Sequence, residues 1–405
     1  MARDTYTPAK DWKDKPDKTT PVLAEDLKHI ESGIQEAKDN RALKELYDDT
    51  AINLGRKAET VVGYNSTAEG TQTSATASQS HAEGLITTAS GYYSHAEGCS
   101  TTASGTQSHA EGLSTTASNS CSHAEGDTTT ASGLAAHAEG KTTKATGSQS
   151  HAEGYSTYAN GQYSHAEGYG TKAHSPSNHA EGYQTTAGIE SSTSIYGAHA
   201  EGGETKATAS YSHAEGYRTT ASADYSHAEG YSTEASGQYS HAEGGETTAS
   251  QNYAHAEGYH TSATAPNSHA EGYYTSASIY AHAEGYYTTA GMNAHAEGYY
   301  TTTGMYAHAE GYYAAASAPY THAEGYYTTA AGQYQHVQGK YNEPNGLYAH
   351  IVGGGTSDSD RKNIHTLDWE GNAVFSGNVT DGNGTSIAYL LSKIEELESK
   401  IEALQ

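Results

Sequence analysis

The side chains with the greatest capacity for chemistry in this chain are histidine and glutamate, and they recur together. The tetrapeptide His-Ala-Glu-Gly occurs eighteen times in 405 residues, from His81 to His322. An imidazole beside a carboxylate can bind a metal ion or transfer a proton. Catalytic and metal sites are normally local, however, whereas this pair is spread along most of the chain. We therefore expect no catalytic residue, no metal and no cofactor, and we interpret the pair as a structural ladder.

The spacing of the histidines predicts the elements that position them. Most steps are fourteen residues long, the step from His179 to His199 takes twenty, and the three steps from His269 to His308 take thirteen. A short fixed period is typical of a repeat architecture in which one unit stacks on the next. The alternation of side chains along a strand places Ala on one face and His and Glu on the other.

A second small residue recurs eight residues after each histidine, as Ala89 follows His81, and Thr303 is the exception. Each turn should therefore contain two short strands whose alanines point into one narrow interior. Gly84 and its equivalents should form the bend, because glycine tolerates unusual backbone angles. The six extra residues between His179 and His199 should form a surface loop.

The composition excludes a conventional hydrophobic core. The chain has one Phe and two Trp against 45 Gly and 35 Tyr, and its net charge is −27. Low hydrophobicity with high charge is typical of disorder, but a disordered segment needs no strict period, so we expect a thin core of Ala, Ser and Thr. The acidic balance argues against a nucleic-acid partner. We also expect no secretory signal, no membrane insertion and free thiols at Cys99 and Cys121.

The strand Ser-His-Ala-Glu-Gly followed by Thr-Thr-Ala-Ser-Gly resembles the repeats of trimeric autotransporter adhesin heads over residues 67–353. The resemblance implies a left-handed parallel β-roll that assembles as a homotrimer, which would also supply the burial that so thin a core lacks. The family has Ser-Val-Ala-Ile-Gly in this strand, and its apolar pair points toward the trimer interior. The corresponding ladder at the trimer interface includes His81, Glu83, His151, Glu153, His227, Glu229, His295 and Glu297.

Two alternatives for the ladder stay open at this point: ions or waters on the three-fold axis, and a metal or ligand array that faces solvent. Stacked turns would place glutamates about 4.8 Å apart. Protonated histidines would relieve the resulting repulsion, so we expect a raised histidine pKa and a melting temperature that falls with rising pH.

Residues 1–60 read as a helical module. Four apolar residues fall on one helix face, and a second amphipathic run follows. The two sets are Leu23, Leu27, Ile30 and Ile34, then Leu43, Leu46 and Tyr47. With Trp12 and Thr20-Pro21 ahead of it, the segment resembles the N-terminal module of tail-fibre and baseplate proteins of phages that infect Gram-positive bacteria. The resemblance implies that this end joins a phage baseplate or tail protein.

The C-terminal part has two further units. Residues 361–379 show the apolar alternation and Gly-Asn turn of a β-hairpin. A heptad pattern then predicts a coiled coil with Lys393 and Glu398 placed for an interchain ion pair. Its core residues are Ile387, Leu390, Ile394, Leu397, Ile401 and Leu404. The order of Ile and Leu alone favours a dimer. Because only about two and a half heptads are present, we give more weight to the β-roll and expect three chains.

Tyrosine becomes frequent toward the C-terminal end of the repeats. From Tyr273-Tyr274 onward, two tyrosines follow each His-Ala-Glu-Gly unit. Tyrosine offers rigid contact area and a hydroxyl group, which suits receptor binding, although stacked tyrosines can also serve only to stabilise a β-roll. The candidate receptor-binding residues are Tyr274, Tyr287, Tyr300, Tyr313 and Tyr327.

These features predict four units: a particle-attachment module (1–60), a β-roll shaft (61–355), a small β-hairpin domain (356–384) and a trimeric coiled coil (385–405). Together they favour a structural fibre of a phage or phage-like tail that attaches to a host cell-surface glycan or protein and performs no catalysis. We expect it in the virion, outside the cell after host lysis. The alternatives are a cell-surface trimeric adhesin and an ice-binding β-solenoid.

Overall fold

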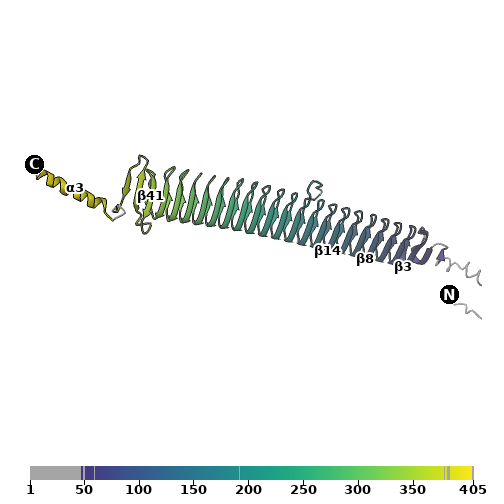
Figure 1. Cartoon of the computed structure of the whole chain (residues 1–405). Helices are drawn as coiled ribbons and strands as arrows, with labels where there is room; N and C mark the ends of the chain where they lie inside the picture. The colour runs from purple at the N-terminus through teal and green to yellow at the C-terminus, as the bar shows by residue number, and fades with distance from the viewer. Residues whose placement is uncertain are drawn as a thin grey trace, which may run out of the picture.

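The computed structural model is a parallel β-solenoid of about 21 turns that forms a long rod (Figure 1). It describes residues 47–48, 51–58, 60–190, 192–377, 379–380 and 384–403. The expected repeat solenoid is therefore confirmed, whereas most of the expected helical module, residues 1–46, lies outside the described residues.

Each turn of the rod contributes one five-residue strand and one two-residue strand. The five-residue strands are β4 (His81–Leu85), β6 (His95–Cys99), β8 (His109–Leu113), β10 (His123–Asp127), β12 (His137–Lys141), β14 (His151–Tyr155), β16 (His165–Tyr169), β18 (His179–Tyr183), β20 (His199–Gly203), β22 (His213–Tyr217), β24 (His227–Tyr231), β26 (His241–Gly245), β28 (His255–Tyr259), β30 (His269–Tyr273), β32 (His282–Tyr286), β34 (His295–Tyr299), β36 (His308–Tyr312), β38 (His322–Tyr326) and β40 (His336–Lys340).

The two-residue strands are β5 (Thr88–Ala89), β7 (Thr102–Ala103), β9 (Thr116–Ala117), β11 (Thr130–Ala131), β13 (Lys144–Ala145), β15 (Tyr158–Ala159), β17 (Lys172–Ala173), β19 (Thr186–Ala187), β21 (Lys206–Ala207), β23 (Thr220–Ala221), β25 (Glu234–Ala235), β27 (Thr248–Ala249), β29 (Ser262–Ala263), β31 (Ser276–Ala277), β33 (Thr289–Ala290), β35 (Thr302–Thr303), β37 (Ala315–Ala316) and β39 (Thr329–Ala330).

Equivalent strands of consecutive turns pair in parallel and in strict register. His81 lies opposite His95 in the first pair of long strands, and Thr88 lies opposite Thr102 in the short ones. A repeated sequence in strict register places every residue beside its own copy one turn away. Each outward position of the repeat therefore forms a column along the rod.

The interior is as thin as the repeat predicts. Ala82 and Ala89, one from each strand of a turn, are fully buried, as are their equivalents along the rod. Thr87 also points inward and is fully buried, and Ser80 closes the interior with 1 % of its surface exposed. Thr303, the exception in sequence, is only half-buried. Most of the core is thus a stack of small side chains, and the larger Val337 and Ile351 enter it only in the last turns.

Glycine forms the bend after each long strand, as expected. Gly84 has φ +108°, and a Cβ placed on it would lie 2.1 Å from the carbonyl oxygen of Gly98 in the next turn. Two further corners use the left-handed region without glycine, at Gln79 (φ 56°) and Ile86 (φ 58°) in the first repeat. Such angles are uncommon for bulky residues, and they recur at both corners in most turns.

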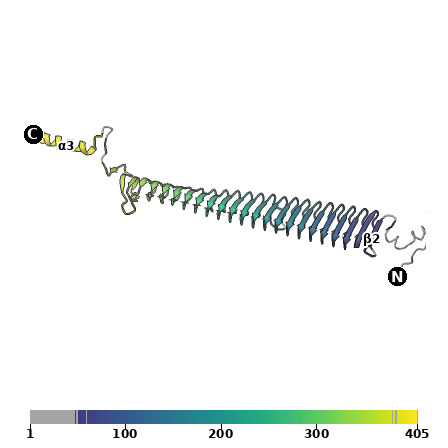
Figure 2. The same ribbon diagram turned by 90° about the horizontal axis from the view of Figure 1, so that it is seen from below.

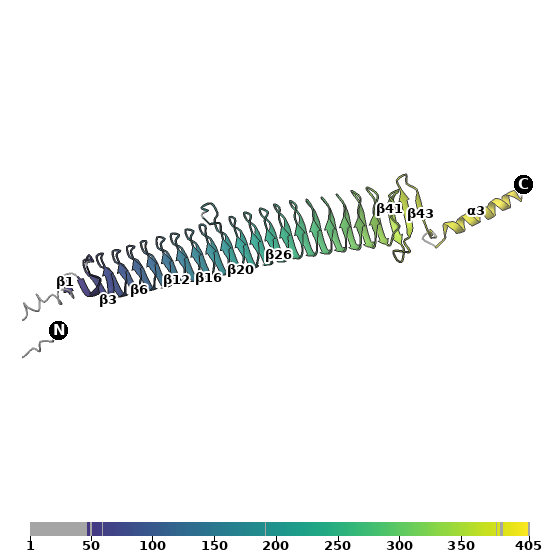
Figure 3. The ribbon, with the colours of Figure 1, turned by 180° about the vertical axis from the view of Figure 1, so that it is seen from behind.

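The extra residues between β19 and β20 protrude from the even row of turns as a loop (Figures 1 and 3). The pairing of the long strands continues past it, with His179 opposite His199. The predicted surface loop is confirmed, and it leaves the register undisturbed.

At the N-terminal end of the rod lies β2 (Ala51–Arg56) (Figure 2). It pairs in parallel with β3 (Ser66–Ala75) and antiparallel with β1 (Tyr47–Asp48). Tyr47, expected in an amphipathic run of the helical module, lies instead in a strand. Tyr47 pairs with Ile52 of β2, and β2 in turn pairs with β3, so the sheet begins before residue 61.

At the other end, β41 (Tyr348–Gly354) continues the parallel ladder and also pairs antiparallel with β42 (Asn363–Asp368). β42 forms the expected hairpin with β43 (Ala373–Phe375). The hairpin covers the backbone edge that the last turn would otherwise expose.

A single helix, α3 (Ile387–Glu402), follows and begins at the N-cap Ser386, whose hydroxyl accepts a hydrogen bond from the backbone N–H of Tyr389. Its expected heptad residues are exposed in the single chain, and Leu404 lies outside the described residues. Lys393 forms an ion pair with Glu396 at 2.6 Å within the helix. The expected partner of Lys393 was Glu398 of another chain, and that pairing remains a prediction.

Candidate functional sites on the outer faces of the solenoid

The histidines of the long strands form a continuous stack along the rod. They point outward because the alanine between His and Glu points inward. The imidazole rings of His81 and His95 lie 4.7 Å apart with an interplanar angle of 12°, and those of His109 and His123 lie 4.8 Å apart at 4°. The stack runs on to His336. Strict register of a repeated residue is the direct cause of this geometry.

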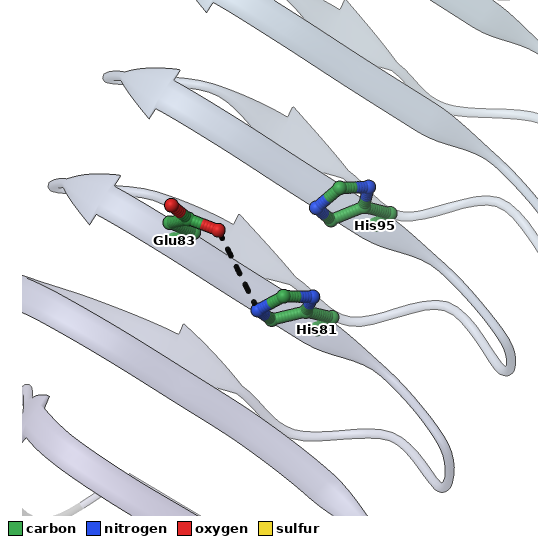
Figure 4. A group of neighbouring side chains, drawn as sticks. All are labelled: His81, Glu83 and His95. Carbon is green, nitrogen blue, oxygen red and sulfur yellow. Dashed lines mark ion pairs between the residues drawn. The ribbon is translucent and has the colours of Figure 1, made fainter.

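From His81 to His295, each histidine of the stack lies next to the glutamate two residues later on the same strand, as Figure 4 shows for His81 and Glu83. The four expected pairs are all present, with Nε2–Oε2 distances of 3.8 Å for His81–Glu83, 3.9 Å for His151–Glu153, 3.8 Å for His227–Glu229 and 3.6 Å for His295–Glu297. These distances are too long for a strong hydrogen bond. The Nε2 atoms have less than 1 Å² exposed and form no hydrogen bond within the described part of the chain.

The pKa of many ladder histidines is lowered, which overturns the expectation of a raised value. For His95 the largest cause is burial, followed by the charges that His81 and His109 would carry, and the nearby Glu97 and Glu83 oppose these effects only in part. Although an ion pair with glutamate would raise the pKa, a separation of 3.5–4.0 Å at a half-exposed site makes that attraction weak. The same direction holds for His123, His137, His165, His179, His213, His227, His282 and His322.

The tyrosines expected to bind a receptor also form one continuous column. The ring centroids of Tyr274 and Tyr287 lie 4.8 Å apart, as do those of Tyr287 and Tyr300, and the rings are parallel within 1°. The column continues through Tyr313 and Tyr327 to Tyr341. All of these residues have a positive φ, from 41° to 54°. Stacking of the large rings is the contact available to offset that backbone strain.

A second column runs beside the first. Tyr273, Tyr286, Tyr299, Tyr312 and Tyr326 stack at 4.8–5.0 Å. The two columns meet at steep angles, for example 60° between Tyr286 and Tyr287. Members of this second column are generally the more exposed, whereas Tyr287, Tyr300, Tyr313 and Tyr327 are half-buried. The pair of columns, rather than the five expected residues alone, forms the surface.

Sequence reasoning missed a third set of tyrosine columns at the opposite corner of the turn. Tyr211, Tyr225, Tyr239 and Tyr253 stack at 5.0–5.2 Å, and Tyr306, Tyr320 and Tyr334 do so at 4.9–5.1 Å. All seven are exposed. The sequence does contain the pattern that predicts these columns, because each of the seven tyrosines stands two residues before a histidine of the stack.

The protruding loop forms part of the wall of a cavity on this otherwise regular surface. Its volume is about 640 Å³, and its walls include Tyr163, His174, Glu190 and Tyr196. Burial lowers the pKa of His174, whose Nδ1 lies 3.3 Å from the side-chain nitrogen of Asn160. The cavity is an open polar groove with aromatic walls.

Compared with models of known protein families and with curated protein sequences, the chain matches none. Among the described helical residues, none forms a segment long and apolar enough to cross a membrane.

Proposed function

We propose that the chain is a homotrimeric fibre of a phage, or of a phage-derived tail particle, that attaches to a glycan on the surface of a host cell. In this proposal the N-terminal segment joins a baseplate or tail protein, and the solenoid projects the tyrosine columns away from it. The fibre belongs to the virion and performs no catalysis. The observation that carries the proposal is the double tyrosine column that runs from Tyr273 to Tyr341 near the C-terminal end of the rod.

The double column has the properties of a binding surface. Its rings are held by backbone register and mutual stacking, so their ordering costs little further entropy on binding. Because each ring face is covered by the next ring, the column presents ring edges and hydroxyl groups at a spacing of about 4.8 Å. A regular row of hydroxyls with apolar edges suits a polyhydroxyl polymer, which is why a glycan is the proposed receptor.

Trimerisation is supported by what the single chain leaves uncovered. The interior of most turns contains small side chains, chiefly Ala, Ser and Thr, so each of these turns buries little apolar surface. In addition, α3 exposes Ile387, Leu390, Ile394, Leu397 and Ile401. Parallel association of identical chains would cover this apolar stripe as a coiled coil. In this arrangement the His–Glu ladder faces the three-fold axis, and the tyrosine columns remain outside.

The alternative of an ice-binding solenoid is less well supported. Thr88, Thr102, Thr116 and Thr130 do form an outward threonine column on β5–β11. Lys144 and Tyr158 interrupt it in the next two turns. A flat threonine face that ends after four turns offers little area for ice.

Binding to host cells tests the proposal. The full-length protein with Tyr273, Tyr286, Tyr299, Tyr312 and Tyr326 changed to Ser should lose at least tenfold in affinity for cells that the unchanged protein binds. The matched control changes Tyr211, Tyr225, Tyr239 and Tyr253 to Ser, which removes a stacked column from the other corner. Equal loss in both variants would exclude a dedicated surface. Labelling intact tail particles with an antibody against this chain tests its place in the virion.

A further inference from the structure

The His–Glu ladder repeats a set of metal-ligand atoms at several of its steps. Two histidines of consecutive turns and the glutamate on the strand of the first bring two imidazole nitrogens and one carboxylate oxygen within 4.8 Å of one another. This holds for His81, Glu83 and His95 (Figure 4), and again for groups along the first half of the rod that reach His165. The expectation of no metal was based on the repetition of the pair. Repetition does not argue against binding where a single step supplies a complete ligand set.

From this geometry we infer that the ladder binds divalent transition-metal cations of the Zn²⁺ class, each through the Nε2 atoms of two stacked histidines and one glutamate carboxylate. Two imidazoles and a carboxylate are a ligand set that Zn²⁺ accepts, with a fourth position open to water. The hard cations Mg²⁺ and Ca²⁺ prefer oxygen ligands and fit this set poorly. The inference concerns the ladder alone and does not depend on the role of the tyrosine columns.

The Nε2 atoms are suited to this role. They lie 3.5–4.0 Å from the nearest glutamate oxygen along the ladder, as in His123–Glu125 and His95–Glu97. They are shielded from solvent and form no hydrogen bond within the described residues. A buried polar atom without a partner is costly. A cation placed between two turns would give such an atom a strong partner and would also neutralise the glutamate.

Binding requires two rings to converge. Nitrogens bound to one tetrahedral Zn²⁺ at about 2.0–2.1 Å lie closer together than the 4.8 Å spacing of the turns. The rings can tilt without breaking the register, because His165–His179 and His227–His241 already differ by 36° and 39° while their strands stay paired.

The ligand geometry sets an upper limit on the number of ions. Each Nε2 has one lone pair, so a histidine can serve only one cation. The eighteen His-Ala-Glu-Gly units, taken in pairs, would therefore hold nine ions per chain at most. Neighbouring ions would be separated by an unused step, which also limits repulsion between them.

Titration of the full-length protein with Zn²⁺ alone, after treatment with a chelator and dialysis, tests the inference. Calorimetry and elemental analysis should give several Zn²⁺ ions per chain and no more than nine. Co²⁺ in place of Zn²⁺ should show the intense visible absorption of a four-coordinate site. Weak absorption typical of six-coordinate Co²⁺ would overturn the proposed ligand set.

Three variants locate the ions. Changing His151, His165 and His179 to Gln should lower the Zn²⁺ content by one or two ions per chain. Changing Glu153, Glu167 and Glu181 to Gln keeps the imidazoles and should weaken binding at those steps at least tenfold. The control changes His174 to Gln, which removes an imidazole outside the ladder, and should leave the content unchanged.

Two results would overturn the inference. One is Zn²⁺ content that is the same in all three variants, or displaced equally well by Mg²⁺, since this would indicate loose association with surface carboxylates. The other is no uptake by a protein whose circular dichroism shows intact β-structure. Sedimentation with and without Zn²⁺ separates metal uptake from assembly, so that failure to trimerise and failure to bind metal are distinguishable.

Discussion

Replacing two interior alanines by leucine tests the central feature of the fold, its narrow core. Ala221 and Ala235 are fully buried and lie directly opposite each other on β23 and β25. Each Leu adds three carbon atoms to a space bounded by the next turns and by buried Thr219 and Thr233. Overpacking of this kind costs about 1–3 kcal/mol per site, so the pair should cost about 2–6 kcal/mol.

Because each turn contacts mainly its two neighbours, this cost should open the rod locally rather than unfold it throughout. Hydrogen–deuterium exchange should therefore accelerate in the turns around β21–β27 and stay slow in the turns around β4–β10. The control places Leu at Thr220 and Glu234, the outward neighbours on the same strands. If exchange around β23 is the same in the interior variant as in this control, the alanines do not point into a packed core.

Three further outcomes follow from the same geometry. Gly230→Ala should destabilise its turn by several kcal/mol in a denaturant titration. The reason is that Gly230 has φ +113° and the new Cβ would lie 2.0 Å from the carbonyl oxygen of Gly244. The control Ser232→Ala should change stability little. In the presence of a chelator, the melting temperature should rise from pH 5 to pH 7.5. Burial lowers the pKa of ladder histidines, so below about pH 6.5 the unfolded chain binds more protons than the folded one. Stability is therefore lost as the pH falls and gained as it rises through this interval. A melting temperature that falls from pH 5 to pH 7.5 would contradict this sign. Sedimentation should give three times the chain mass of 42.5 kDa, and changing Ile394 and Leu397 to Ser should weaken the trimer; a folded monomer would contradict the assembly.

The repeat period was sufficient to predict the strands and the core. Ala82 and Ala89 occupy fixed positions in a period that is too short for a helix-containing unit, and both are buried as expected. The stacking of the histidines and tyrosines follows from the same register. For a repeat in which each residue lies beside its own copy, one-dimensional spacing translates directly into three-dimensional neighbours.

Local residue preferences failed at the corners. Ile86 and Gln79 adopt left-handed backbone angles that such residues avoid in isolation. The ladder of hydrogen bonds between turns imposes these angles, as when the N–H of Ile86 donates to the carbonyl of Thr71 at 2.9 Å. The backbone angles that a residue type prefers in isolation contain no information about this constraint from the neighbouring turn.

The predicted shift of the histidine pKa had the wrong sign for a related reason. From sequence, the charges of stacked glutamates are evident, and they favour a proton on the imidazole. The structure adds the burial of each ring and the presence of two imidazole neighbours, as for His95 between His81 and His109. Both disfavour the charged form, and together they outweigh the glutamates at their distance of nearly 4 Å.

Changes in repeat length explain why the double tyrosine column lies where it does. The distance from each ladder histidine to the second small residue is always eight residues, so every insertion or deletion falls in the segment that follows it. The protruding loop between β19 and β20 and the shortened turns after His269 both lie at that variable corner. Tyrosine columns there are interrupted, as between Tyr253 and Tyr306, where Asn267 and Asn293 occupy the corresponding position. The double column occupies the corner whose length never changes, and it is therefore the tyrosine surface that can keep a constant spacing over many turns, as attachment to a repeating glycan would require.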